Sequence, residues 1–331
     1  MFNRLDPRSV PIPFFVVLLS MLQVCGCSSD PVLPPPPPDA WVSQQSGTHE
    51  ALWDVCFIDT NTGTAVGTNG TILRTTDGGA NWVGQTSGTS VHLLGVAFTD
   101  VNTGTAVGGD GTFLTILRTT DGGENWVTQL REKRAVYLRS VSFSDADTGT
   151  VVGNFGTILR TTDGGGTWVD QASGTLKHLR DVSFTDANTG TVVGLDGTIL
   201  RTTNGGETWA TQTSGTGSWL FGVFFTDTNT GTAVGGFGRI LRTTDGGATW
   251  AIQRSGSYSE LHSVVFIGPN IGTVVGGGSI LRTTDGGANW VHQIGSGGGL
   301  FGYYGVSFTD ANTGTVAGDW GTILRTTSGG Q

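Results

Sequence analysis

The sequence predicts an all-β fold, a seven-bladed β-propeller with four antiparallel strands in each blade. Glycine accounts for 56 of 331 residues and charged residues for only 13 %, a composition that favours short strands and tight turns over helices. The tag ILRTT recurs about every 40 residues, with its arginine at positions 74, 118, 160, 201, 242, 282 and 325. Units of this length with four strand-like runs are typical of propeller blades.

The unit that begins at residue 179 shows the four predicted strands, which we name A to D. LRDVSFTD is followed by a turn, then by TVVG, by TILRTT and by TWATQTSGT. Because the connections are short, we expect an antiparallel meander. The C–D turns read DGG or NGG in most units, and these residues tolerate the positive φ angles that tight hairpins need.

The last unit stops at Gln331, where its strand D should begin. The missing strand is predicted near the N-terminus, because AWVSQQSGT at 40–48 matches NWVGQTSGT at 81–89. This segment should pair with the last unit and close the ring, which removes two exposed sheet edges. The propeller is therefore assigned to residues 41–331.

Residues 1–27 have the pattern of a lipoprotein-type signal peptide. Arg4 and Arg8 precede the apolar run PIPFFVVLLSMLQV, which is shorter than a typical membrane span. VCGC resembles a bacterial lipobox, so we expect Cys27 to carry the lipid; an ordinary cleaved signal is the alternative. Residues 28–40 are predicted to be a stiff proline-rich linker. The chain is then expected to be exported and anchored to a bacterial membrane, on the periplasmic or cell-surface face.

The octet TTDGGANW, which recurs with small changes, resembles the Asp box of the bacterial neuraminidase repeat, S/T-x-D-x-G-x-x-W. The longer unit VSFTDANTGTVVGLDGTILRTTNGGETW is similar to the photosystem II stability and assembly factor family, seven-bladed propellers built of such repeats. The similarity covers residues 41–331. It implies that the Asp box is a peripheral turn and not a catalytic centre, and it implies a role in assembly. Nothing in the sequence shows a photosynthetic host.

The residues of the octet also favour a structural role. An aspartate in this turn can accept backbone N–H bonds, while the tryptophan packs between blades. Two units replace the aspartate by asparagine or serine, which a hydrogen-bond acceptor tolerates and a catalytic carboxylate does not. We expect the arginine of ILRTT to pair with a nearby turn carboxylate. The structural Asp-box positions are Asp77, Asp121, Asp163, Asn204, Asp245 and Asp285.

Chain direction sorts the loops onto two faces of the predicted ring. The A–B and C–D turns share face two and are nearly the same in every unit. The B–C and D–A loops share face one, and their sequences differ between units. Weakly constrained loops would vary in this way without any function. The functional alternative is a binding surface, because exposed aromatic residues are uncommon without a partner.

Basic residues place the expected contact around blades three and four. Six cations outside ILRTT fall in the adjacent segments REKRAVYLRS and LKHLR, which suit an acidic partner segment. A solvated charge cluster is the alternative. The predicted partner-binding residues are Arg131, Lys133, Arg134, Tyr137, Arg139, Lys177, Arg180, Trp219, Tyr303 and Trp320.

Composition and spacing argue against several other functions. The net charge of −9 disfavours nucleic acid as a partner. The five histidines lie in different units and no calcium loop is complete, so we expect no metal and no cofactor. If the first two cysteines are removed or lipidated, Cys56 has no disulfide partner. A monomer is expected.

The sequence thus predicts a non-catalytic, membrane-anchored scaffold that binds a protein partner, itself membrane-associated. The alternative is a carbohydrate-active propeller, either a sugar-binding module or a sialidase-like glycosidase. Glycoside hydrolysis needs two carboxylates at a matched separation, and the sequence does not pair the carboxylates of face one. Aromatic residues over a central opening with inward carboxylates would favour a sugar, whereas a flat aromatic and basic patch would favour a protein.

Overall fold

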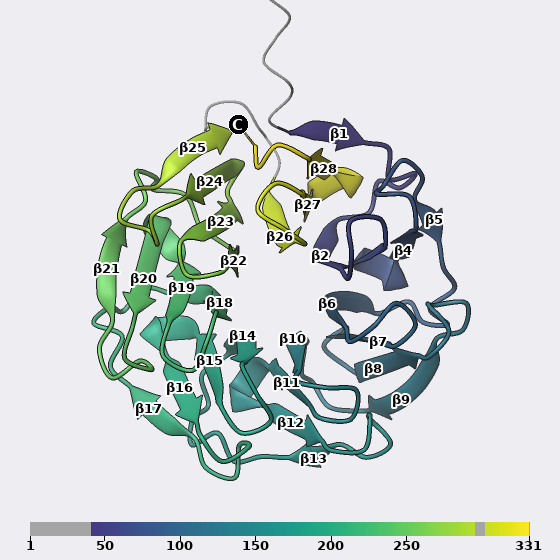
Figure 1. The fold of residues 1–331 in the computed structure, drawn as a ribbon. Helices are drawn as coiled ribbons and strands as arrows, with labels where there is room; N and C mark the ends of the chain where they lie inside the picture. Colours follow the sequence, from purple (N-terminus) through teal and green to yellow (C-terminus); the bar gives the residue numbers. More distant parts are fainter. Residues whose placement is uncertain (1–40, 295–301, 331) are drawn as a thin grey trace, which may run out of the picture. The chain divides into compact units, whose positions relative to one another are not determined.

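The computed structural model describes residues 41–294 and 302–330, which form seven four-stranded antiparallel sheets around a central axis (Figure 1). The predicted fold class is confirmed. Residues 1–40, with the predicted signal peptide, Cys27 and the linker, lie outside the described residues. Within the described part of the chain, no helix is long and apolar enough to cross a membrane.

The blades follow one another along the chain, and strand A of each blade lies nearest the axis (Figure 1). The first three blades are β2 (Leu52–Phe57), β3 (Gly63–Gly67), β4 (Ile72–Thr75) and β5 (Val83–Gly84); β6 (His92–Phe98), β7 (Gly104–Gly109), β8 (Leu114–Thr119) and β9 (Val127–Glu132); and β10 (Leu138–Phe143), β11 (Gly149–Gly153), β12 (Ile158–Thr161) and β13 (Val169–Asp170).

The remaining blades have the same order. They are β14 (Leu179–Phe184), β15 (Gly190–Gly194), β16 (Ile199–Thr202) and β17 (Ala210–Gln212); β18 (Leu220–Phe225), β19 (Gly231–Gly235), β20 (Arg239–Thr243) and β21 (Ala251–Arg254); β22 (Ser263–Ile267), β23 (Ile271–Gly276), β24 (Ser279–Thr283) and β25 (Val291–Ile294); and β26 (Tyr303–Phe308), β27 (Gly314–Gly318) and β28 (Ile323–Thr326) with β1 (Val42–Gln44). Short 3₁₀ turns occupy five B–C loops: η1 (Thr68–Gly70), η2 (Asn154–Gly156), η3 (Leu195–Gly197), η4 (Gly236–Gly238) and η5 (Asp319–Gly321).

The N-terminal strand closes the ring, as predicted. β1 pairs antiparallel with β28, with Val42 opposite Arg325 and Gln44 opposite Ile323. The preceding Trp41 reaches the neighbouring blade, where its Nε1 donates to Gln293 Oε1 at 3.0 Å. Segments from the two ends of the described chain thus share one sheet.

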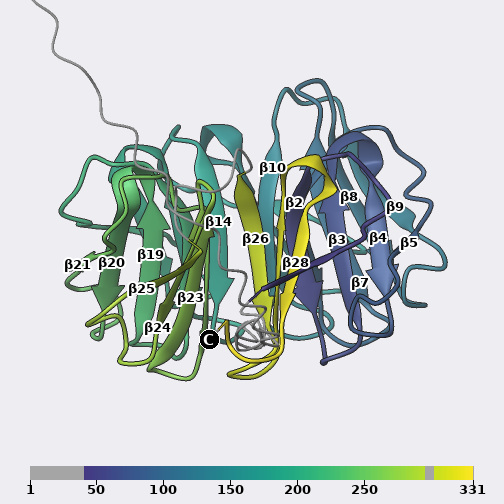
Figure 2. The same cartoon turned by 90° about the horizontal axis from the view of Figure 1, so that it is seen from above.

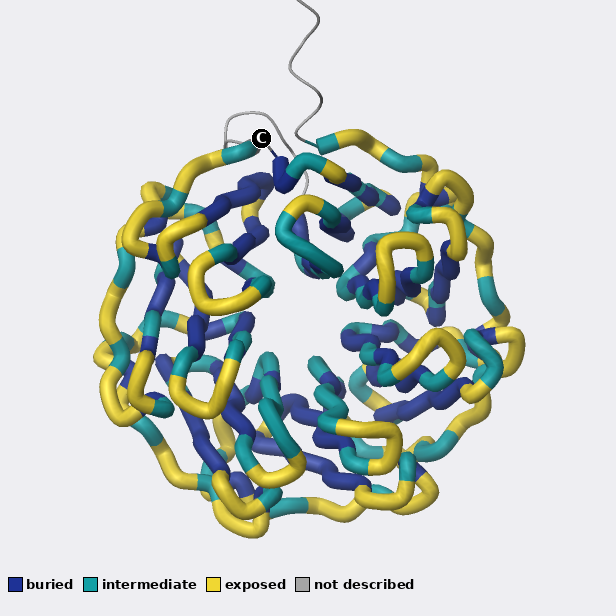
Figure 3. Tube along the Cα trace, in the orientation of Figure 1, coloured by how far each residue is buried: buried dark blue, intermediate teal, exposed yellow. Residues whose placement is uncertain are grey.

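The hydrophobic core lies between neighbouring blades. Strand A has the pattern L-x-x-V-x-F in most blades, and its leucine, valine and phenylalanine pack against strands B and C of the preceding blade. Leu52, Val55 and Phe57, for example, form one buried cluster with Ala317 and Ile323. Figure 3 shows buried residues along the inner strands and exposed residues on the loops and the outer rim. Blade contacts therefore carry most of the apolar burial that stabilises the ring.

The arginine of ILRTT joins each blade to the next, but not through a carboxylate as we expected. Arg74 donates through Nη1 to Thr64 Oγ1 at 2.8 Å and through Nη2 to the Val101 carbonyl oxygen at 2.5 Å. Its guanidinium also lies 4.8 Å from the centre of the Phe98 ring, in the next blade. The guanidinium is thus bound by a carbonyl oxygen and a ring of the next blade. The arginines of all seven ILRTT tags make the same three contacts, with a threonine hydroxyl, a backbone carbonyl oxygen and a phenylalanine ring.

The TTDGG turns make a second connection between blades. Asp77 Oδ1 accepts the backbone N–H of Asn81 at 2.9 Å, so the aspartate holds its own turn. Gln44 of the preceding blade donates to the Gly78 carbonyl oxygen at 2.8 Å and accepts from Trp82 Nε1 at 3.1 Å. In the fourth blade Asn204 Oδ1 accepts the equivalent bond from Thr208 at 3.1 Å, which explains why asparagine is tolerated.

The loops divide between two faces as the chain direction predicts. The C–D turn meets the A–B turn on face two, where Gly78 N donates to the Asn61 carbonyl oxygen at 2.8 Å. The B–C loop meets the D–A loop on face one, where Thr68 N donates to the Ala51 carbonyl oxygen at 2.9 Å. Figure 2 shows the blades from the side, with loops at both ends of the strands. The loops that vary between repeats are therefore gathered on face one.

Candidate functional site

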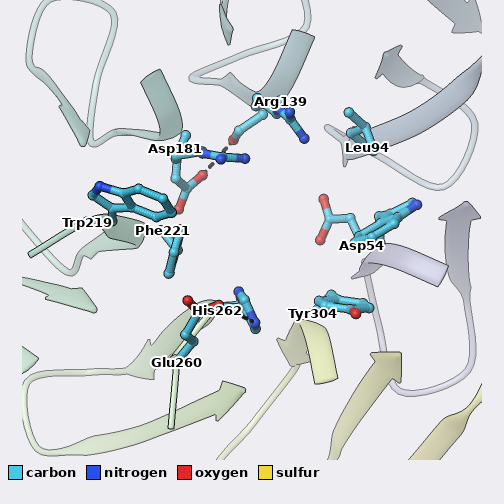
Figure 4. Close-up of a pocket in the computed structure, with 13 residues that line it drawn as sticks. Asp54, Leu94, Arg139, Asp181, Trp219, Phe221, Glu260, His262 and Tyr304 are labelled. Carbon is cyan, nitrogen blue, oxygen red and sulfur yellow. Dashed lines mark hydrogen bonds and ion pairs between the residues drawn. The ribbon is translucent and has the colours of Figure 1, made fainter. Parts of the chain in front are cut away.

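A pocket of about 300 Å³ lies at the centre of the ring, on the side of face one. Every blade contributes at least one side chain to its wall, and in all seven blades the residue at the second position of the strand-A motif is among them. Several of them are labelled in Figure 4. These central-ring residues are Trp53, Leu94, Arg139, Arg180, Phe221, His262 and Tyr304.

In six of the seven blades a β-bulge turns the central-ring residue towards the pocket. In blade one Leu52 pairs with Gly67, but Asp54 pairs with Val66, so Trp53 is an extra residue without a cross-strand partner. The same register shift occurs at the start of strand A in blades two, three, four, five and seven. An extra residue of this kind breaks the alternation of a strand and redirects a side chain. As a result, two consecutive positions, such as Trp53 and Asp54, both line the pocket.

Five rings form a continuous aromatic arc along one side of the pocket. The centres of neighbouring rings lie 4.4 Å apart for Trp53 and Tyr304, 5.2 Å for Tyr304 and His262, 5.2 Å for His262 and Phe221, and 6.3 Å for Phe221 and Trp219. Burial lowers the pKa of His262, which favours the neutral ring. Burial and Asp319, whose Oδ1 accepts from the Tyr304 hydroxyl at 3.0 Å, raise the pKa of Tyr304 to about 12. The arc is thus an uncharged surface.

Two arginines from neighbouring blades form the arginine pair, Arg139 and Arg180. Arg139 lies across the pocket from His262 and Tyr304 (Figure 4). Burial, with the nearby charge of Arg180, lowers the pKa of Arg139 to about 10, so both guanidiniums remain charged at neutral pH. The ion pairs among the described residues involve other cations. Arg139 Nε donates to Asn154 Oδ1 at 3.2 Å, and the remaining N–H donors of the pair can bind an anion.

Two carboxylates are set into the wall and tie strands A together. Asp54 Oδ2 accepts the backbone N–H of Val96, in the next blade, at 2.9 Å. Asp181 Oδ2 accepts the N–H of Val223 at 2.7 Å in the same way. Burial raises the pKa of Asp54 to about 7 and also raises the pKa of Asp181. The corresponding residues of the other blades are glycine or serine: Gly95, Ser140, Gly222, Ser263 and Gly305.

The pocket brings together three of the predicted partner-binding residues, Arg139, Arg180 and Trp219. Tyr137 lies beside this group, with the Arg139 guanidinium 5.1 Å from the centre of its ring. Trp320 does not line the pocket and stands 68 % exposed at the tip of η5.

The other predicted cations lie outside the pocket. Arg131 stacks on the Phe113 ring at 4.7 Å, Arg134 forms an ion pair with Asp170 at 2.8 Å, and Lys177 pairs with Asp196. Lys133 is exposed. The predicted basic cluster is therefore divided into a pocket pair and a set of rim charges.

Tyr303 occupies a different environment from the one we expected of a partner-binding residue. Its side chain is only 7 % exposed and packs in the core with Val275 and Ile280. The bulge places Tyr303 at the leucine position of strand A, so the next residue, Tyr304, reaches the pocket. Tyr303 therefore belongs to the core and has little surface to offer a partner.

Sequence reasoning missed that a single strand position supplies the whole central ring. Leu94 and His262 were not connected with the aromatic and basic residues that they adjoin. A signal was present: the second position of L-x-x-V-x-F changes from tryptophan to arginine to histidine, while the leucine, valine and phenylalanine positions stay nearly constant. Variation inside an otherwise repeated buried strand indicates a position that does not serve the core.

The comparisons with known proteins find an assembly-factor family model that matches part of the chain and solved propellers that are similar to most of it. Residues 85–174 match the family described as "Photosynthesis system II assembly factor YCF48". No curated protein matches. The solved structure "YCF48 bound to D1 peptide" has a TM-score of 0.73 at 23 % identity and covers 88 % of this chain and 96 % of its own. YCF48 from Cyanidioschyzon merolae has a TM-score of 0.71 at 21 % identity, covering 86 % of this chain and 98 % of its own.

Enzymes are also found among the similar structures. A catalytically inactive virginiamycin B lyase from Staphylococcus aureus, solved with Quinupristin, has a TM-score of 0.73 at 12 % identity and covers 87 % of this chain and 98 % of its own. The likeness in fold is therefore shared by binding proteins and enzymes. The function has to be argued from the site.

Proposed function

We propose that the chain is a non-catalytic, membrane-anchored scaffold that binds a segment of a protein partner in its central pocket. The observation that carries the proposal is the two-sided wall: an arginine pair free of ion pairs and an aromatic arc. Guanidinium groups bind carboxylates in a directed way, and aromatic residues supply most of the energy of typical protein contacts. The pocket suits a peptide that presents a carboxylate beside apolar side chains.

Unsatisfied donors in the wall support a bound ligand. Trp53 Nε1 and Arg180 Nε are buried and have no hydrogen-bond partner among the described residues. Buried polar groups without a partner are uncommon in folded proteins and call for an explanation. Both side chains line the pocket, and a peptide that shifted them on binding would offer carbonyl or carboxylate oxygens to these donors.

The size of the pocket limits the ligand. A volume of about 300 Å³ holds one or two side chains or a chain end, not a folded domain. The rim cations Arg131, Lys133 and Lys177 lie outside the pocket and would act on the encounter, because exposed charges mainly change association rates. The solved structure "YCF48 bound to D1 peptide" is a propeller of this fold with a peptide, and it supports the same kind of ligand here.

The membrane attachment is part of the proposal and rests on the sequence pattern of residues 1–40. A lipid on Cys27 and a stiff polyproline linker would hold the propeller near the periplasmic or cell-surface face of a membrane. Replacement of Cys27 by Ser should release the protein from the membrane fraction and abolish labelling with a fatty-acid analogue. Retention in the membrane without that label would contradict lipidation.

A sugar ligand is the second candidate, because the aromatic arc shares the pocket with Asp54, Asp181 and Glu260. A pKa of about 7 for Asp54 would suit a general acid. Both aspartates, however, accept backbone N–H bonds from the next blade, so they have a structural task. Sialidase-like chemistry needs a cluster of arginines around the substrate carboxylate and a tyrosine nucleophile. The pocket offers only two arginines, and burial makes its Tyr304 a weaker acid.

The test is capture of partners from detergent-solubilised membranes of the host with tagged full-length protein. The double variant Arg139→Gln, Arg180→Gln should lose the partner, whereas Arg254→Gln, which changes an exposed arginine of β21, should retain it. Thermal melting would verify that all variants fold. A glycan array probed with the same proteins tests the sugar alternative.

Two outcomes would contradict the proposed site. The first is unchanged capture by the double variant, with loss of capture when Arg131, Arg134 and Lys177 are all reversed to Glu; the contact would then lie on the rim of blades three and four. The second is a specific glycan that the double variant no longer binds, with no protein captured by the wild type. The pocket would then be a sugar site.

A further inference from the structure

Face one carries a set of aromatic side chains that neither the core nor the central pocket uses. Phe155, Phe237 and Trp320 are 55 %, 78 % and 68 % exposed, and each is the middle residue of the 3₁₀ turn in its B–C loop. We name these three residues the aromatic tips. They belong to blades three, five and seven, and because they share one structural position they stand at the same level above the ring.

The backbone at the aromatic tips is strained for such residues. Their φ angles are +57°, +58° and +55°, in the left-handed region that bulky side chains rarely adopt. The same position holds Asn69 in blade one and Asp196 in blade four, at φ +54° and +56°, and these residue types tolerate it. The turn itself therefore does not require an aromatic residue. Exposed hydrophobic residues kept in a strained conformation point to a function of the side chain.

The charges of the molecule are distributed unequally between its faces. Face two carries exposed carboxylates in both sets of turns: Asp59, Asp77, Asp100, Asp145, Asp163, Asp227, Asp245 and Asp285. The arginines of ILRTT close to these turns are engaged between blades. The exposed cations Lys133 and Lys177 lie in face-one loops. Face one also carries exposed carboxylates, Asp110, Glu132, Asp196 and Glu260, but fewer than face two. Face one is therefore the less acidic side and the one better suited to approach a negatively charged surface.

The spacing of the aromatic tips favours a lipid surface over a protein partner. Residues that dominate protein interfaces cluster in one packed patch, but the aromatic tips lie on separate, non-adjacent blades. Outside the pocket, the described face-one loops between them add single exposed apolar side chains, Leu176 and Tyr258, and no packed cluster. Insertion at the headgroup level of a bilayer needs only amphipathic rings at a common depth, helped by cations that meet anionic lipids.

We propose that face one docks on the surface of an anionic lipid bilayer and inserts the aromatic tips at the level of the headgroups. A single lipid chain gives only marginal, reversible attachment, so this contact would act as a second attachment beside Cys27. It would also turn the central pocket towards the membrane. The inference does not depend on what the pocket binds.

The test uses residues 41–331, because all seven sheets and the buried core lie within this part of the chain. The protein is sedimented with vesicles of phosphatidylcholine that contain phosphatidylglycerol, and with vesicles of phosphatidylcholine alone. The test variant carries Phe155→Asn, Phe237→Asn and Trp320→Asn, which install the residue type that blade one has at this position. Its binding to the anionic vesicles should fall by about tenfold or more, because three apolar side chains no longer insert.

The matched control removes three exposed apolar residues from the outer rim, with Val83→Ser, Val169→Ser and Val291→Ser. These valines are 63 %, 62 % and 64 % exposed, so the control loses a comparable number of exposed apolar side chains without touching face one. It should bind as the wild type does. The test variant should melt no lower than the wild type, because asparagine relieves backbone strain at the tips.

Three results would overturn the inference: no sedimentation of the wild type with anionic vesicles, equal binding by the test variant, or an equal loss in the rim control. The wild type could fail to bind vesicles, and the test variant, unlike the rim control, could fail to capture a membrane-protein partner. The aromatic tips would then form a protein contact instead. Loss of vesicle binding with intact capture through Arg139 and Arg180 would separate this surface from the pocket.

Discussion

Replacement of Asp54 by asparagine should change how the stability of the ring depends on pH. The pKa of Asp54 is raised from 3.8 to about 7, chiefly by burial in the pocket wall. Between these values the folded chain holds a proton that the unfolded chain releases. Raising the pH across this window therefore lowers the free energy of unfolding. The stabilising contribution is complete below pH 3.8 and is lost above about pH 7.

The size of the effect follows from the shift. Each pKa unit corresponds to about 1.4 kcal/mol, so the shift from 3.8 to about 7 sets an upper limit near 4 kcal/mol. Asp54 lines the pocket and stays partly accessible to water, which screens its charge. We therefore expect about 2 kcal/mol. The asparagine variant lacks this pH dependence, although it also loses one of the two oxygens that accept from Val55 and Val96.

Urea unfolding near pH 4.5 and near pH 8 measures the difference in stability between wild type and variant. The advantage of the wild type should shrink by about 2 kcal/mol at the higher pH. Glu260→Gln is the control, since it removes a carboxylate from the same pocket. If the difference between wild type and Asp54→Asn is the same at both pH values, the burial argument for Asp54 is wrong.

The remaining predictions concern the ring closure and the turn aspartates. Deletion of 41–44 removes β1 and the contact of Trp41 with Phe308, and should cost about 3 kcal/mol or more; Val42→Ala, at a side chain 49 % exposed, should have little effect. A truncated chain that unfolds at the same urea concentration as the parent would refute closure by β1. Asp163→Ala should lower the melting temperature near pH 7. Hydrogen bonds from Thr167 hold the pKa of Asp163 below its usual range, so its contribution is present above pH 3.8 and is lost as the pH falls further. Asp163→Asn should melt at a temperature closer to that of the wild type, because Asn204 fills the same position in blade four. If the alanine variant lowers the melting temperature equally near pH 7 and near pH 3, the carboxylate does not have this role.

The fold could be predicted because every blade repeats the same local signals. Each repeat has a turn that needs glycine, a strand with L-x-x-V-x-F spacing and the ILRTT strand, and each signal acts between residues close in sequence or one repeat away. Even the closure by β1 was visible as a match between Trp41 and Trp82. Seven consistent repeats leave little room for another arrangement.

The pocket was harder to predict because it depends on a register shift. A strict alternation of strand A would send Trp53 and Asp54 to opposite sides of the sheet. The bulge between Leu52 and Asp54 turns both towards the axis, and nothing in the local sequence marks it. The same shift explains why Tyr303 was expected on the surface and lies in the core, while Tyr304 reaches the pocket.

The arginine of ILRTT shows a second limit of sequence reasoning. A turn carboxylate was the plausible partner, since both lie on face two, but the structure gives Arg74 a carbonyl oxygen and a phenylalanine ring of the next blade. A backbone carbonyl is present in every residue and carries no sequence signal. Interactions with the backbone of another repeat are therefore hard to infer from side-chain types alone.

Positions that are the same in every blade stabilise the ring, whereas positions that vary between blades line the pocket. Arginines such as Arg74 and Arg242 are held between blades by a carbonyl oxygen and a phenylalanine side chain. They therefore stabilise the propeller and have few N–H donors left for a ligand. Arg139 and Arg180 stand instead at the bulged position, which no blade needs for its core, and their guanidiniums stay free of ion pairs with the described carboxylates. Because the seven central-ring positions lie outside the buried hydrophobic clusters between blades, they can change chemistry from blade to blade at little cost in stability. This is why the pocket can combine charge with an aromatic wall on a nearly uniform scaffold.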